Sequence, residues 1–172
     1  MELFNEWLVF SLILLGIWFI IFSISKKFRK EMFLVSLFTM PFGLTEPLFV
    51  PEYWNPPSLF NLATITGLDI ESFIFSFAIG GIGAVLYNIF FKVKRKKMDK
   101  YKMHSKMHRF HLISLLSPLF VFLIFYIFTE LNPIYSASVA MFFGGVTTIL
   151  CRPDLKKEVW MGGVLFFFLY FV

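Results

Sequence analysis

Residues 7–24 read WLVFSLILLGIWFIIFSI, a stretch of eighteen residues without a charge. An α-helix needs about 20 consecutive, mostly apolar residues to cross the hydrocarbon core of a bilayer. The apolar part of a cleavable signal is shorter, about 7–15 residues, and it follows basic residues, whereas here Lys26 comes after the stretch. The sequence therefore predicts that this stretch is a membrane-spanning helix.

Further apolar runs follow the first. They occupy residues 32–50, 70–91, 112–128 and 135–150, and a sixth run begins near Val159 and reaches Val172. The fourteen residues of the sixth run would extend about 21 Å as a helix, less than the roughly 30 Å of the hydrocarbon core, so this run is interpreted as truncated. The predicted fold is all-α, a polytopic transmembrane helix bundle of five full helices plus a truncated sixth. Seven helices are expected if the chain continues past Val172.

The composition supports burial in lipid. Hydrophobic residues make up 58% of the chain, 26 residues are Phe, and the mean hydropathy is +0.77. A soluble domain carries about 45–50% apolar residues, so a chain of this size cannot hide its excess in one globular core. The single cysteine, Cys151, excludes an internal disulfide framework and a cysteine-rich metal site.

The charged residues predict an orientation. Basic residues occur only in three connections, with four from Lys26 to Lys30, nine from Lys92 to Arg109 and three from Arg152 to Lys157, which together are all 16 in the chain. With five alternating helices, all of them fall on one side, which the positive-inside rule makes cytoplasmic. The N-terminus is then outside a multi-pass protein of the cell membrane. The predicted organisation is a first three-helix unit with the acidic motif (1–91), a basic cytoplasmic loop (92–111), and the start of a second, incomplete unit (112–172).

Small residues recur every four positions in two of the runs. They are Ser76, Gly80 and Ala84 in the third run, and Ser136, Ala140 and Gly144 in the fifth. This spacing allows two helices to approach closely in lipid, where packing drives association. The pattern predicts helix–helix contacts within the bundle.

Acidic residues open the third run. Asp69 is placed to cap the helix. Glu71 lies near the start of the helix, where a negative charge interacts favourably with the positive end of the helix dipole. The alternative is functional, because acidic groups are costly at the edge of an apolar, lipid-accessible cavity and often mark a site there.

The stretch from Glu46 to Tyr87 resembles the lycopene cyclase domain of the flavin-free, polytopic membrane type. The resemblance rests on E-P-L-F-x-P-x-Y-W-N-P-P (46–57), on G-x-x-x-E-x-x-x-F-x-F (67–77), and on a glycine-rich helix ending V-L-Y (85–87). The second element of such proteins usually reads G-x-P-x-E-E-x-x-F. This sequence matches it at Gly67, Glu71 and Phe75, and it departs at Asp69 and Ser72, where Pro and a second Glu are usual. Family members carry two such halves and only one is found here, which suggests the first two-thirds of a seven-helix protein.

The resemblance implies a carotenoid cyclase that closes the acyclic ends of lycopene or a related carotenoid without net redox change. A general acid would protonate a terminal double bond, the neighbouring double bond would attack the carbocation, and a base would remove a proton. Glu71 is the expected acid, and Asp69, Glu46 and Glu130 are candidates for its partner. Tyr53, Trp54 and Phe75 would stabilise the cation, although Tyr53 and Trp54 equally suit a role as interface anchors. No dinucleotide-binding motif follows a strand, so no cofactor is expected.

The other sequence patterns are weaker evidence for a function. His104, His108 and His111 lie at i, i+4 and i+7, a spacing that can hold a metal, but the surrounding lysines would repel a cation, so no metal is expected. The segment from Lys92 to Arg109 suits anionic lipid headgroups rather than nucleic acid. Two rival hypotheses stay open: a non-catalytic carotenoid-binding or scaffold membrane protein that lost the second carboxylate at Ser72, and a small transporter subunit. The sequence does not decide between a homo- and a hetero-oligomer.

Overall fold

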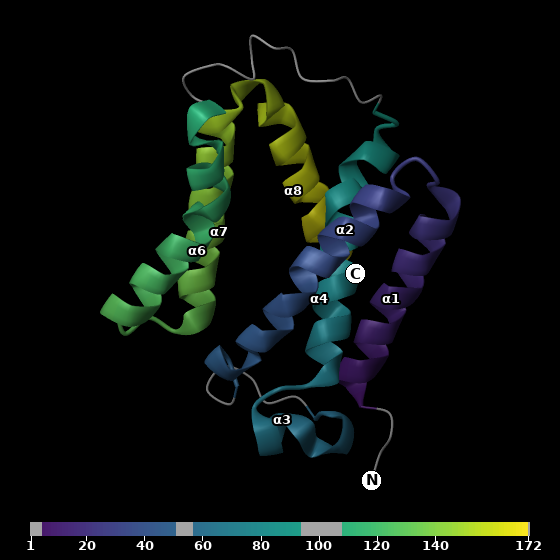
Figure 1. Cartoon of the computed structure of the whole chain (residues 1–172), viewed down its shortest axis with the longest axis vertical. Helices are drawn as coiled ribbons and strands as arrows, with labels where there is room; N and C mark the ends of the chain where they lie inside the picture. Colours follow the sequence, from purple (N-terminus) through teal and green to yellow (C-terminus); the bar gives the residue numbers. More distant parts are fainter. Residues whose placement is uncertain (1–4, 51–56, 94–107, 172) are drawn as a thin grey trace. The chain divides into compact units, whose positions relative to one another are not determined.

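The computed structural model describes residues 5–50, 57–93 and 108–171, and these residues contain helices and connections but no strand (Figure 1). Within these described ranges, four helices are long and apolar enough to cross a membrane: α1 (Glu6–Ile24), α4 (Ile70–Phe90), α6 (His111–Phe128, preceded by the 3-10 turn η3, His108–Phe110) and α7 (Pro133–Cys151). Each coincides with one of the predicted apolar runs, so the all-helical class is confirmed. The chain divides into two compact units, residues 1–92 and residues 93–172.

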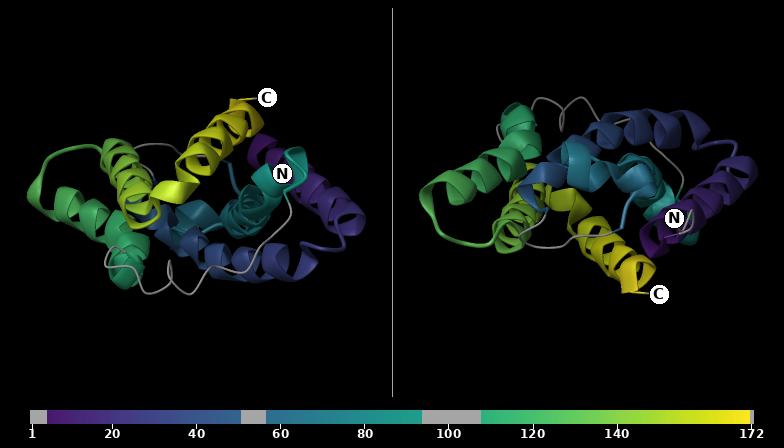
Figure 2. Two further views of the ribbon diagram at one scale, coloured as in Figure 1. Left: turned by 90° about the horizontal axis from the view of Figure 1, so that it is seen from above. Right: turned by 90° about the horizontal axis from the view of Figure 1, so that it is seen from below.

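The first unit is built around α4, which contacts both α1 and α2 (Arg29–Thr39) (Figures 1 and 2). The indole Nε1 of Trp18 in α1 donates a 2.9 Å hydrogen bond to Ser36 Oγ in α2. Gly81 of α4 lies against this bond, and a Cβ atom there would be 2.1 Å from Ser36 Oγ and 2.4 Å from Trp18 Nε1. The three helices can therefore meet only because position 81 has no side chain.

The neighbouring glycine makes a second close contact. A Cβ atom on Gly80 would lie 2.0 Å from Thr39 Oγ1, and the Thr39 hydroxyl donates a 2.9 Å hydrogen bond to the carbonyl of Ser76. Ser76 and Gly80 belong to the predicted small-residue face, and its close approach to another helix is confirmed. Hydrogen bonds of this kind help to hold helices together where lipid supplies no hydrophobic driving force.

The second predicted run differs from a single α-helix. The α-helix α2 ends at Thr39, and a 3-10 helix, η1 (Met40–Leu48), continues the chain. Pro41 and Pro47 explain the change, because a proline has no N–H to donate and its ring collides with the preceding turn of an α-helix. Two short helices, η2 (Leu59–Asn61) and α3 (Leu62–Thr66), then lead to α4.

The second unit contains an antiparallel hairpin of α6 and α7, followed by the 3-10 turn η4 (Pro153–Leu155) and α8 (Lys156–Phe171). The helix α8 begins three residues before the predicted start at Val159. The hairpin is held by a 2.8 Å hydrogen bond between the hydroxyls of Ser117 and Thr147. A Cβ atom on Gly144 would lie 2.4 Å from Cγ of Pro118, so this glycine makes room for the proline ring.

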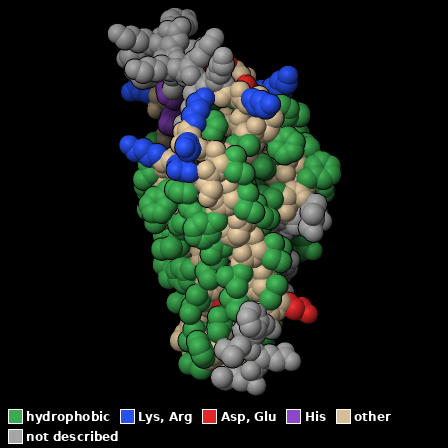
Figure 3. Space-filling view, turned by 90° about the vertical axis from the view of Figure 1, so that its right-hand side faces the viewer, with side chains coloured by type: hydrophobic (Ala, Val, Ile, Leu, Met, Phe, Trp, Pro, Cys, Tyr) green, Lys and Arg blue, Asp and Glu red, His purple; other side chains and the backbone are tan. Residues whose placement is uncertain are grey.

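Large hydrophobic side chains cover much of the surface of the described residues. The face in Figure 3 shows hydrophobic side chains between a group of basic residues at one end and an acidic side chain at the other. On α6, Leu112, Leu115 and Ile127 are each about two-thirds exposed, and Ser114 is the one buried residue. A soluble protein rarely exposes so much contiguous apolar area. This exterior is compatible with a membrane protein.

Candidate functional site

Asp69 is the N-cap of α4. Its backbone is extended, and its Oδ1 accepts a 2.5 Å hydrogen bond from the backbone N–H of Ser72. This confirms the capping role predicted from the sequence. Burial raises the pKa of the Asp69 carboxyl, hydrogen bonds from Ser72 act in the opposite direction, and the nearby Glu71 carboxyl raises the pKa again. Asp69 precedes the apolar helix and is 2% exposed.

Glu71 lies in the first turn of α4 and is fully buried. Its Oε1 accepts two hydrogen bonds, one of 3.0 Å from Nδ2 of Asn5 and one of 2.8 Å from the backbone N–H of Leu59. Asn5 is in turn the N-cap of α1, where its Oδ1 accepts a 2.6 Å hydrogen bond from the N–H of Leu8. Glu71 therefore joins the start of α1, the segment before α3 and the start of α4.

The second oxygen of Glu71 differs from the first. Oε2 is buried and has no hydrogen-bond partner among the described residues. An ionised oxygen in that position would lose its hydration without compensation, which is costly. The two oxygens of the Glu71 carboxyl group therefore lie in different surroundings.

Glu46 brings another carboxyl group to the same place. It lies in η1, is 8% exposed, and its Oε2 accepts a 2.7 Å hydrogen bond from the hydroxyl of Ser72. Ser72 thus contacts Asp69 through its backbone and Glu46 through its side chain. The start of α4 gathers three buried acidic residues, Asp69, Glu71 and Glu46.

Two glycines position η1 against this end of α4. A Cβ atom on Gly43 would lie 2.9 Å from the ring of Phe73, so a larger residue would push η1 away. Gly67 ends α3 with a φ of +74°, a left-handed conformation that glycine adopts at little cost, and it turns the chain toward Asp69. A Cβ atom on Gly67 would lie 3.5 Å from Pro47 of η1.

An aromatic group lies one turn further along. Phe75 is four residues after Glu71 and therefore on the same face of α4. Its ring centroid is 5.1 Å from that of Trp7 and 6.1 Å from that of Phe10, and the Trp7 and Phe10 rings are 5.9 Å apart. Three aromatic rings, two from α1 and one from α4, thus lie together on the side of α4 that carries Glu71.

The remaining predicted site residues are placed differently. Glu130 is exposed in the connection between α6 and α7, which belongs to the second unit, whereas Asp69, Glu71 and Glu46 belong to the first. Tyr53 and Trp54 lie outside the described residues. Sequence reasoning missed Asn5, Leu59 and Trp7 as neighbours of the acidic residues. Asn5 stands immediately before an apolar run, a signal for an N-cap, but nothing local indicates its bond to Glu71.

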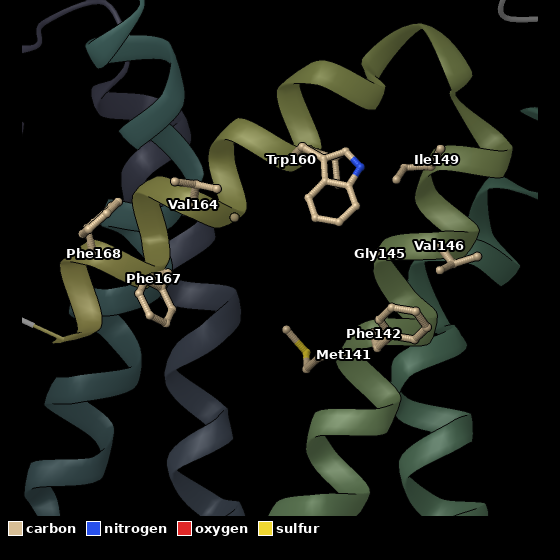
Figure 4. Close-up of a pocket in the computed structure, with 11 residues that line it drawn as sticks. Met141, Phe142, Gly145, Val146, Ile149, Trp160, Val164, Phe167 and Phe168 are labelled. Carbon is tan, nitrogen blue, oxygen red and sulfur yellow. The ribbon is translucent and has the colours of Figure 1, made fainter.

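The second unit has an apolar cavity of about 550 Å³ between α7 and α8 (Figure 4). Met141, Phe142, Trp160 and Phe167 are among its eleven lining residues, none of which carries an acidic or basic group. Such a cavity suits a hydrocarbon but offers no group for proton transfer. The acidic side chains described above belong to the first unit, so this cavity and the acidic cluster are separate features.

One group in the second unit has the residue types of a metal site. The donor atoms of His108, His111 and Cys151 all lie within 4.8 Å of one another. From the sequence, no metal was expected at the histidines, because the surrounding lysines would repel a cation. Cys151 was not part of that pattern, since it is 40 residues from His111.

Comparison of the chain with protein-family models, with curated proteins and with solved structures finds no match. The fold and the site accordingly define a class only: in the part of the chain that the structure describes, an all-helical protein with four helices that are long and apolar enough to cross a membrane.

Proposed function

We propose that this protein is a polytopic membrane enzyme that cyclises lycopene or a related carotenoid by acid-initiated carbocation chemistry, without a redox cofactor. The observation that carries the proposal is the carboxyl group of Glu71, which is fully buried and has an Oε2 atom without a partner among the described residues. Glu71 is also the acid that matches the resemblance to the lycopene cyclase domain.

In the proposed reaction, Oε2 of Glu71 donates its proton to a terminal carbon–carbon double bond. The electron pair of that bond forms the new C–H bond, and a tertiary carbocation remains. The neighbouring double bond supplies its electron pair to close the ring, which moves the cation into the ring. A base then removes a proton beside the cation and a ring double bond forms. Substrate and product are isomers, so the balance requires no oxidant or reductant.

Glu46 is the proposed base. Ser72 occupies the position at which the resembling family usually has a second Glu, and its hydroxyl holds Glu46 Oε2 at 2.7 Å. The carboxylate that is missing from α4 is thus supplied by η1. Two carboxyl groups in different surroundings can divide the roles of acid and base. Asp69 is already engaged in capping α4 and is the weaker candidate.

The rings of Trp7, Phe10 and Phe75 are proposed to stabilise the cation. An aromatic face attracts a positive charge without forming a bond to it, and the interaction strengthens when water is excluded. Phe75 was expected in this role from the sequence. Trp7 and Phe10, which pack against Phe75, would add two rings from α1 to this role.

The proposed topology has five spans, with the N-terminus outside and the basic connections, including the lipid-binding segment 92–109, in the cytoplasm. The helical rod from α2 through η1 extends about 34 Å at the rises of the two helix types, enough for the hydrocarbon core. It would act as the second span, with the acidic cluster near the outer surface.

Pigment analysis of lycopene-producing cells tests the proposal. Cells that express the chain in full length should convert lycopene into a cyclic carotenoid, and cells that express the Glu71→Gln variant at the same membrane level should accumulate lycopene. Unchanged lycopene with the wild-type protein present in the membrane would contradict a cyclase.

A non-catalytic scaffold is the second candidate. The bonds from Asn5 and Leu59 to Glu71 favour it, because they give this residue a structural task that needs no chemistry. A scaffold that binds carotenoid would co-purify with unchanged lycopene, and the same pigment extraction, performed on the purified protein, separates the two functions.

A further inference from the structure

His108, His111 and Cys151 form a compact group in the second unit, separate in the chain from the proposed cyclase residues. His108 lies in η3, His111 is the first residue of α6, and Cys151 is the last residue of α7. The two helices are antiparallel, so the start of α6 meets the end of α7. We propose that these three side chains bind one Zn²⁺ ion, through Nδ1 of both histidines and Sγ of Cys151.

The distances fit this ion. Sγ of Cys151 lies 3.8 Å from Nδ1 of His108 and 3.8 Å from Nδ1 of His111. Tetrahedral zinc with Zn–S bonds of about 2.3 Å and Zn–N bonds of about 2.0–2.1 Å places sulfur and nitrogen about 3.5 Å apart. Both sulfur–nitrogen distances are close to this value, and all the donor atoms lie within 4.8 Å of one another.

The helices hold the donors in place. The Ser117–Thr147 hydrogen bond fixes the register of the hairpin about two turns from His111 and one turn from Cys151. The packing of Gly144 against Pro118 prevents the helices from sliding. A metal site needs such rigid support, because its ligands must be held close to the productive geometry.

The local charge permits a cation. Arg152, next to Cys151, is paired with Asp154 at 2.9 Å and 3.0 Å, so its charge is already balanced. A thiolate at Cys151 adds a negative charge when metal replaces its proton. The negative end of the α7 dipole offsets the positive end of α6 beside it. The Cys151 thiolate and the negative end of the α7 dipole therefore oppose the repulsion that the nearby lysines exert on a cation. The sequence alone did not place either group near the histidines.

The ligand chemistry selects the metal class. Imidazole and thiolate donors suit zinc and its chemical relatives, whereas Ca²⁺ and Mg²⁺ prefer oxygen ligands. Three protein ligands leave the fourth tetrahedral position for water or another group. The ion would clip α6 to α7 at the end opposite the 129–132 connection.

The test uses the full chain, purified in detergent and stripped with a chelator. Titration with Co²⁺ should produce a thiolate-to-cobalt charge-transfer band with one equivalent bound, and Zn²⁺ should displace the cobalt, while Ca²⁺ and Mg²⁺ should not. Because Cys151 is the single cysteine, the band reports this thiol alone. Cys151→Ser should abolish the band. His111→Gln should weaken zinc binding by more than about 100-fold, since loss even of outer-shell partners costs about 10–100-fold.

Ser138→Ala is the matched control: it changes the same hairpin but removes neither a ligand nor a contact between α6 and α7, and it should keep the stoichiometry. His111 is exposed, so its replacement should not disturb folding if Cys151→Ser does. The proposal is overturned if the wild-type protein shows no charge-transfer band. It is equally overturned if His111→Gln binds zinc as the wild type does, or if binding is lost with His104→Gln and retained with His111→Gln.

Discussion

The hydroxyl of Ser72 donates a 2.7 Å hydrogen bond to Oε2 of Glu46, a residue 26 positions earlier in the chain. Ser72 thereby connects η1 to the capped start of α4. Taken alone, a serine at this position indicates a lost carboxyl group. In the fold it holds a carboxyl group that comes from another element.

Ser72→Ala should lower the stability of the protein. The change removes a buried hydrogen bond to a carboxylate, which typically costs about 1.5–3 kcal/mol of unfolding free energy. Denaturation in detergent measures the effect. The matched control is Ser138→Ala, which removes an exposed hydroxyl bonded only within α7 and should change stability by less than about 0.5 kcal/mol. Equal effects of the two changes would show that the Glu46 contact contributes nothing.

Two adjacent glycines of α7 should respond oppositely to alanine. Gly144→Ala places a Cβ atom 2.4 Å from Cγ of Pro118, and overpacking of this kind typically costs about 1–3 kcal/mol. Gly145→Ala meets nothing within 4 Å and should be neutral or stabilising by about 0.5–1 kcal/mol, because alanine favours a helix. Thermal unfolding of the two variants compares them directly, and a Gly144→Ala variant as stable as wild type would contradict the close contact.

Labelling of introduced cysteines tests the orientation. The proposed topology places Asn55 outside and Lys100 in the cytoplasm, because all 16 basic residues segregate to one side. In a Cys151→Ala background, an impermeant thiol reagent should label Asn55→Cys in intact cells and Lys100→Cys only after the membrane is opened. Labelling of Lys100→Cys in intact cells would contradict the proposed orientation.

The helices were readable from the sequence because their signals are local. The uncharged run 7–24 became α1 with a boundary shift of one residue, and Asp69 caps α4 as its spacing predicts. The break of α2 after Thr39 follows from Pro41, which is also visible in the sequence, although the 3-10 continuation to Leu48 was not predicted.

The contacts of the site could not be predicted from the sequence, because they join residues that are far apart in the chain. Asn5 reaches Glu71 across 66 positions, and Cys151 reaches His108 across 43. Helical periodicity tells which residues share a face, but it does not tell which face of another helix they meet. From the sequence, Glu71 was predicted to be the catalytic acid, which stays a prediction, and the partners of its carboxyl group were left undetermined.

The pKa of Asp69, raised by burial, gives the stability a pH dependence of known sign. The folded protein holds this proton more tightly than the unfolded chain, so the contribution is fully present below the ordinary value of 3.8 and is lost as pH rises through the folded pKa. Asp69→Asn keeps the cap and removes the titration. The unfolding free energy of the variant, relative to wild type, should therefore increase with pH across this window. A difference that stays constant or shrinks with pH would contradict the raised pKa.

Glu71→Gln should abolish cyclisation while the protein still folds. The side-chain oxygen of glutamine can accept the hydrogen bonds from Asn5 and Leu59 that Oε1 of Glu71 now accepts, so the joint between α1, the segment before α3 and α4 is kept. The amide nitrogen replaces Oε2 and cannot donate a proton to a double bond as a carboxylic acid does. General acid–base groups typically contribute about 10²- to 10⁴-fold to the rate, so the loss of cyclic pigment should be large.

Asp69→Asn is the matched control for this loss, because it changes a carboxyl group of the same cluster to an amide and preserves the cap. It should retain most of the cyclic product. Glu71→Ala separates structure from chemistry: it leaves the donors of Asn5 and Leu59 without their acceptor, so it should reduce both the amount of folded protein and the product. If Glu71→Gln makes cyclic product at the wild-type rate and Asp69→Asn does not, Asp69 is the acid. If both amide variants are active, Glu71 serves only to join the helices, and the proton comes from another residue, of which Glu46 is the remaining acid of this cluster.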